Sequence, residues 1–167
     1  LTAEGQSDLN IRRIFTTGWQ SDWKNSMESQ LLSISPKAKL LKVDWGKNPK
    51  DYQAAPIKIT FWYEIPDYAI IGNDEMALPL TMHGLYDQVR SYLRIDTDIP
   101  ERQYGFKDGC SRLVELDETI QLPQGYRLVQ SVEDNRKSPA ADFEGYIRQE
   151  NNKIDIHQKL ALKKRVY

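Results

Sequence analysis

The stretch PIKITFWYEIPDYAIIGNDEMALPL, residues 56–80, begins with a regular alternation of apolar and polar side chains. One side of an extended chain would carry its apolar residues: Ile57, Ile59, Phe61, Tyr63 and Ile65. The other side would carry Lys58, Thr60 and Glu64, with Trp62 among them. A period of two is typical of a β-strand with one face in the core and the other in water. Gly72 and Asn73 then predict a turn into a further strand.

Upstream of this strand the pattern predicts a strand, a helix and a second strand. Residues 8–17 place Leu9, Ile11 and Phe15 on one side of an extended segment. Residues 21–34 form an amphipathic helix, because their apolar side chains recur every three or four residues and Ser21 suits the N-cap. Residues 38–46 return to a strand with these residues on one face: Leu41, Val43 and Trp45.

Downstream, short alternating segments separated by turns predict further strands. Residues 85–95 are compatible with a helix or a strand, and Asp108 and Gly109 predict the turn of a hairpin over 103–116. Alternation over 114–122 resumes at Tyr126 and reaches Val132, and 133–141 is predicted to be a loop. A short strand around Tyr146 and Ile147, a turn and a last strand at 154–162 complete the chain.

This succession predicts a mainly β protein, an antiparallel β-sandwich with one N-terminal amphipathic helix. Residues 1–167 would form a single domain, in which 1–50 is a leading strand-helix-strand segment and 51–167 is the sandwich body. Because the chain begins at Leu1 rather than methionine, we expect it to be a piece of a larger protein.

The composition argues against several classes of partner. The 23 basic and 24 acidic residues nearly cancel, so we expect no nucleic acid partner. No run approaches the roughly 20 apolar residues of a membrane-spanning helix. A single cysteine, Cys110, excludes a disulfide within the chain.

A catalytic cysteine is the sharpest enzymatic hypothesis. Cys110 would be the nucleophile, assisted by His83 or His157 and by Asp108. However, Cys110 follows a predicted hairpin turn, and His157 alternates with charged residues on the wet face of the last strand. We therefore predict a semi-buried thiol, two surface imidazoles and no catalytic residue.

Metal or cofactor sites are not predicted either. Two histidines and one cysteine lack the ligand spacing of a zinc site. The sequence Asp96–Asp98 offers oxygen atoms for calcium, but it lacks the glycine and the closing glutamate of an EF-hand. We interpret it as a solvated loop.

The aromatic residues suggest a binding surface. Trp19, beside Gly18, and Trp62, on the polar side of its strand, are the candidate ligand-binding residues, because flat rings stack on sugars and peptides. The alternative is that these two rings cover a second layer or the helix.

Three stretches resemble the C-terminal β-rich domain, of unknown function, of bacterial transglutaminase-like proteins of the Bacteroidetes type. The stretches are APIKITFWYEIPDYAIIGNDEMALPL, DETIQLPQGYRLVQSV and NKIDIHQKLALKKRVY, and residues 8–34 are similar to the segment that precedes this domain. The resemblance rests on prolines and glycines at strand ends and covers nearly the whole chain.

The resemblance implies a non-catalytic accessory or scaffold domain. The parent protein would carry a papain-like transglutaminase domain with a Cys-His-Asp triad, and none of those catalytic positions maps onto this sequence. The implied partner is that catalytic domain, and the implied location is the periplasm or cell envelope. A glycan- or peptide-binding module that uses the exposed aromatic residues is the alternative.

Overall fold

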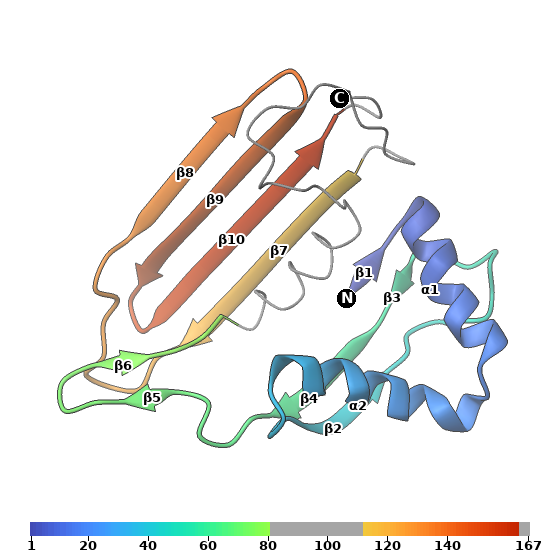
Figure 1. Ribbon diagram of the computed structural model, residues 1–167, viewed down its shortest axis with the longest axis horizontal. Coiled ribbons are helices and arrows are strands. Elements are labelled where there is room, and N and C mark those ends of the chain that lie inside the picture. The colour runs from blue at the N-terminus through green and yellow to red at the C-terminus, as the bar shows by residue number, and fades with distance from the viewer. Residues whose placement is uncertain (81–111, 164–167) are drawn as a thin grey trace, which may run out of the picture. The chain divides into compact units, whose positions relative to one another are not determined.

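The computed structural model describes residues 1–80 and 112–163 (Figure 1). The chain divides into two compact units, Leu1–Gly84 and Leu85–Tyr167, and each is described by itself. Strand β2 (Lys39–Asp44) pairs with β4 (Thr60–Glu64), so residues on both sides of position 50 belong to the first unit. A single domain with an internal division at residue 50 stays a prediction.

The first unit combines two helices with short antiparallel strand pairs. Its remaining elements are, in chain order, β1 (Thr2–Ala3), α1 (Gly5–Thr17), the 3-10 turn η1 (Gln20–Asp22), α2 (Trp23–Ile34), β3 (Ile57–Lys58), β5 (Ile70–Ile71) and β6 (Met76–Ala77). Strand β1 pairs with β3, β2 with β4, and β5 with β6. The alternation predicted for the first strand is confirmed, because Ile57 and Ile59 are buried whereas Lys58 and Trp62 are exposed.

Helix α1 corrects the strand predicted at residues 8–17. In a helix, residues four positions apart share a face, and this spacing joins Ile11 to Phe15 and Asp8 to Arg12. Arg12 is buried on the inner side of this helix, whereas Arg13, which interrupts the apolar side of the predicted strand, is exposed. The described residues therefore contain two α-helices where one was predicted.

Helix α2 confirms the predicted amphipathic helix, with Trp23 and Leu31 buried on its inner face. Its N-cap residue is Asp22, and Ser21 lies one residue earlier in the 3-10 turn. Strand β2 also confirms its prediction, except that its register shifts between Leu40 and Lys42. This bulge leaves Leu41 exposed, while Val43 and Trp45 pack against the core.

An aromatic cluster forms the centre of the first core. The rings of Phe15, Trp23 and Trp45 meet edge to face, with centroids 5.0–5.6 Å apart. Ile57, Ile59 and Ala3 are buried together with Phe15 and Trp23, and the partly buried Trp45 packs against them. The core therefore joins α1, α2 and the strand that the alternating sequence predicted.

The buried guanidinium of Arg12 connects α1 to the loop before β3. Its Nε donates to both carboxylate oxygens of Asp8 at 3.0 Å. Its other nitrogens donate to three backbone carbonyls, those of Asn48, Pro49 and Ala55. Asp8 also accepts a hydrogen bond of 2.7 Å from the backbone N–H of Ile57. A buried cation is tolerable here because its donors are matched by acceptors.

The second unit contains an antiparallel sheet of four strands, which lie side by side in Figure 1. The strands are β7 (Arg112–Gln121), β8 (Val132–Lys137), β9 (Ala141–Glu150) and β10 (Lys153–Leu162), in the spatial order β7-β10-β9-β8. The predicted turn after Glu150 and the predicted last strand are confirmed.

Two predictions in this region are wrong, and a third is confirmed in position but not in length. Residues 133–137, predicted to be a loop, belong to β8, because their polar side chains are accepted in an edge strand with exposed surfaces. Residues 126–131 do not extend the preceding strand. The short strand predicted around Tyr146 is ten residues long, since its charged residues occupy one face in alternation with apolar ones.

The register separates a polar from a mostly apolar face of this sheet. Ile156 pairs with Glu118 on β7 and with Ile147 on β9, whereas the next residue, His157, pairs with Asp117 and Tyr146. The mainly β fold with antiparallel sheets is thus confirmed, and the sandwich stays a prediction. Within the described parts of both units, neither helix has the length and apolar content that a bilayer crossing requires.

The first prediction concerns the Arg12 network. Arg12→Ala removes the donors to Asp8 and three carbonyls, and we expect it to lower the free energy of unfolding by roughly 3 kcal/mol or more. Arg13→Ala is the matched control, because Arg13 is exposed on the same helix. Chemical denaturation measures both variants. Equal effects of the two substitutions would contradict a structural role for the buried guanidinium.

The second prediction concerns acid. The hydrogen bond from Arg12, aided by the N–H of Ile57, lowers the pKa of Asp8 below its ordinary value of 3.8. Because the unfolded chain binds this proton more readily, the stabilisation is present above pH 3.8 and is lost as the pH falls through the lower folded pKa. Asp8→Asn should flatten the pH dependence of the unfolding free energy in that acidic range. An unchanged slope would show that Asp8 does not contribute.

Candidate functional site

The polar face of the four-stranded sheet brings together a histidine and two carboxylates. Asp117 on β7 lies directly opposite His157 on the neighbouring strand β10. The His157 Nδ1 is 2.7 Å from the Asp117 Oδ1. An ionised carboxylate only accepts hydrogen bonds, so Nδ1 carries the proton and donates it. This bond fixes the tautomer of the ring.

Glu115 completes the cluster. It precedes Asp117 by two residues and therefore points to the same face of β7. The ligand atoms of Glu115, Asp117 and His157 all lie within 4.8 Å of one another. Lys159 on β10 pairs directly with Glu115 on β7, and its Nζ lies 3.9 Å from the Glu115 Oε2. The cluster thus combines two carboxylates, one imidazole and one neighbouring ammonium group.

The ring of His157 is held on its other side by Tyr146 of β9. The two rings stack with centroids 5.3 Å apart and planes inclined by 25°. The guanidinium carbon of Arg148 lies 4.3 Å from the centroid of the Tyr146 ring. As a result, the His157 side chain is only 12% exposed, although it stands on the polar face. The sequence placed it on the correct face, but its description as a surface imidazole is wrong.

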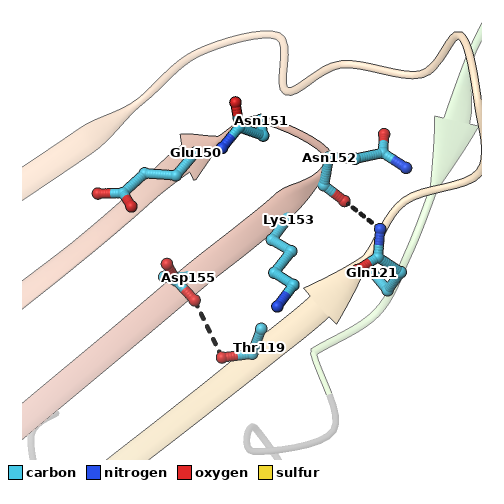
Figure 2. Close-up of a pocket in the computed structure, with 7 residues that line it drawn as sticks. All are labelled: Thr119, Gln121, Glu150, Asn151, Asn152, Lys153 and Asp155. Atoms are coloured by element: carbon cyan, nitrogen blue, oxygen red, sulfur yellow. Dashed lines mark hydrogen bonds between the residues drawn. The ribbon is translucent and has the colours of Figure 1, made fainter.

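A shallow concavity of about 460 Å³ lies on the same face, at the end of the sheet where β9 turns into β10 (Figure 2). It is lined by Thr119, Gln121, Glu150, Asn151, Asn152, Lys153 and Asp155. The Thr119 hydroxyl donates to Asp155 and the Gln121 amide donates to the Asn152 carbonyl, each at 2.9 Å. The lining can donate and accept hydrogen bonds, but many of its polar groups already bond to one another.

At the opposite end of the polar face, another carboxylate is held by a lysine. The Lys163 Nζ donates to Asp142 at 2.6 Å and to the Ser138 carbonyl at 3.1 Å. The hydrogen bond from Lys163 holds the pKa of Asp142 below its ordinary value. We interpret this group as structural, since it joins the end of β10 to the turn between β8 and β9.

The predicted ligand-binding residues Trp19 and Trp62 lie in the first unit, and both are exposed. Trp19 follows the end of α1 and is 80% exposed, and Trp62 on β4 is 44% exposed. The Lys42 ammonium lies 4.8 Å from the Trp62 ring centroid, because these two residues pair across β2 and β4. The alternative, in which these two rings cover a second layer or the helix, stays a prediction, and the exposed fractions show that both rings are at least partly open.

The sequence did not predict the cluster of Glu115, Asp117 and His157. Residues 115 and 157 lie 42 positions apart, and only the register of β7 against β10 shows that they meet. The sequence did give one signal for these residues. Asp117 alternates with apolar residues on one predicted strand, and His157 occupies a polar position of another predicted strand. That signal indicates the face of each strand but not its partner.

Other candidate residues lie outside the described part of the chain. They are Cys110, His83, Asp108 and the segment Asp96–Asp98. The catalytic cysteine hypothesis is therefore tested only for His157, whose Nδ1 bonds to Asp117.

Comparison of the chain with protein-family models, curated proteins and solved structures finds no match. The resemblance to the C-terminal domain of transglutaminase-like proteins consequently rests on the sequence motifs alone.

The third prediction concerns the exposure of the indole rings, which collisional quenching of fluorescence measures. Trp19→Phe should lower collisional quenching of tryptophan fluorescence by acrylamide more than Trp62→Phe, because Trp19 is the more exposed ring. Trp23→Phe is the control, since it removes a ring that is only 6% exposed and should leave or raise the average quenching constant. Quenching that is insensitive to Trp19→Phe would contradict the exposed position of this ring.

Proposed function

We propose that this chain is a non-catalytic accessory domain of a larger bacterial envelope protein, and that it acts by binding rather than by catalysis. The observation that carries the proposal is the exposure of Trp19 and Trp62. The other two tryptophans, Trp23 and Trp45, pack in the aromatic core. An indole in water provides a large, rigid contact surface, and such residues are enriched where proteins bind partners.

The proposed partner is a transglutaminase-like catalytic domain of the same protein, and the proposed location is the periplasm or cell envelope. The motif resemblance of the sequence supports both points. We also propose the β-sandwich as the architecture of the domain. In support, alternate residues of the four-stranded sheet form a mostly apolar face suited to a second layer, with members that include Val114, Leu116, Ile120, Ile156 and Leu160.

A glycan- or peptide-binding module is the second candidate, and the setting of Trp62 favours it. The ring stands on a β-strand, which is more rigid than a loop, and its strand neighbours on the same face are polar. Lys42 lies against the ring, and Lys39 and Glu64 form an ion pair one step along the strand pair. Flat rings flanked by hydrogen-bonding groups suit sugars, whose faces are apolar and whose edges are polar.

The accessory proposal is tested by adding the separately produced transglutaminase-like domain to this chain and measuring association by isothermal titration calorimetry. We expect binding that weakens about tenfold or more in Trp19→Ala or Trp62→Ala, the size of effect typical of central interface aromatics. Val129→Ala is the matched control, because Val129 is exposed but lies in the other unit. An absence of heat and of any change in catalytic activity would refute docking.

The second candidate is tested by titrating tryptophan fluorescence with soluble peptidoglycan fragments and with chitin and cellulose oligosaccharides. A ligand that stacks on Trp62 should change the emission of the wild-type chain and much less that of Trp62→Phe. If no probe in this panel changes the emission, the glycan-binding candidate fails and the docking proposal is unaffected. The two results thus separate the candidates.

A further inference from the structure

We propose that Glu115, Asp117 and His157 bind a divalent transition metal ion, with Zn²⁺ as the best-matched ion. The site lies on the polar face formed by β7 and β10 and uses none of the residues proposed to bind a partner. It is therefore independent of the proposed function.

The spacing of the ligand atoms is close to the spacing around one bound ion. Ligand atoms that each lie about 2.1 Å from a zinc ion are at most about 4.2 Å apart. The nitrogen and oxygen atoms of this cluster lie within 4.8 Å of one another, and the His157 Nδ1 and Asp117 Oδ1 are 2.7 Å apart. A small rotation of the carboxylates closes the remaining gap. Such rotation is unhindered by burial, because the side chains of Glu115 and Asp117 are 45% and 71% exposed.

The imidazole is already oriented for the ion. Tyr146 stacks against the ring, and the cross-strand position of Asp117 directs its Nδ1 toward the carboxylates. An entering cation displaces the proton between Nδ1 and Asp117: Nδ1 releases its proton to solvent while Nε2 takes one up, so the ring binds through the Nδ1 lone pair as a neutral imidazole. The sheet holds the backbone of all three residues, so the backbone loses little conformational entropy when the ion binds.

The ligand types select the class of ion. Imidazole nitrogen is a good ligand for Zn²⁺, Ni²⁺ and Co²⁺. In contrast, Ca²⁺ and Mg²⁺ are hard cations that are bound through oxygen atoms. Three protein ligands on a solvated face leave the remaining coordination positions to water. The Lys159 ammonium, 3.9 Å from Glu115, is the local competitor for the cation, because it occupies the same carboxylate and repels positive charge.

Isothermal titration calorimetry of the chelator-treated full chain with zinc chloride, at neutral pH, tests the proposal. We expect one zinc ion per chain, with His157→Ala abolishing binding and Asp117→Asn or Glu115→Gln weakening it about tenfold or more. Lys159→Gln should tighten binding, which a purely structural role of the cluster does not predict. Glu133→Gln is the matched control, because Glu133 is an exposed acid on the same face of the sheet.

Two further measurements make the result decisive. Cys110→Ser and His83→Ala should keep the zinc affinity of the wild-type chain, since neither belongs to the cluster. Circular dichroism of Asp117→Asn and Glu115→Gln should match the wild type, because these carboxylates are exposed. Zinc binding that persists in His157→Ala, that is lost in Cys110→Ser or His83→Ala, or that is no tighter than calcium binding would overturn the proposal.

Discussion

The central position of β10 is the constraint on which the second unit depends. All ten of its residues pair with β7 on one side and with β9 on the other. Because strand side chains alternate between faces, a shift of one residue would carry His157 to the apolar face and Ile156 into water. The register that buries Ile156 is therefore the same register that places His157 beside Asp117. Packing and the candidate metal site are consequences of one pairing.

The first unit is held together by different interactions. Over residues 1–80 its strands are short and paired only in twos, so the sheet hydrogen bonds do not hold the unit together by themselves. The aromatic cluster of Phe15, Trp23 and Trp45 supplies apolar burial, and Arg12 ties α1 to a loop that has no regular structure. A guanidinium suits this task, because its planar set of donors satisfies several carbonyl groups at once. Asp8 balances the charge and also anchors β3 through the N–H of Ile57.

The two candidate sites use different chemistry and lie in different units. The indoles of Trp19 and Trp62 offer apolar area, whereas the polar sheet face offers charge and ligand atoms. Such a division is compatible with an accessory domain that contacts a partner through one unit and holds an ion through the other. Each site is complete within its own unit, so neither proposal needs a particular arrangement of the two units.

The sequence by itself determined those features that arise from local periodicity. Alternation identified the strand from Ile57 and the last strand, and the spacing of Trp23 and Leu31 identified α2. It failed at 8–17, where Ile11 and Phe15 fit the period of a strand and that of a helix, and where the helix also brings Asp8 beside Arg12. It also failed at β8, whose side chains are polar because the strand is an exposed edge. Only the tertiary structure decided which strands pair and in which register, since backbone hydrogen bonds are the same for every sequence. The meeting of His157 with Asp117 and Glu115 follows from that pairing, and no local pattern encodes it.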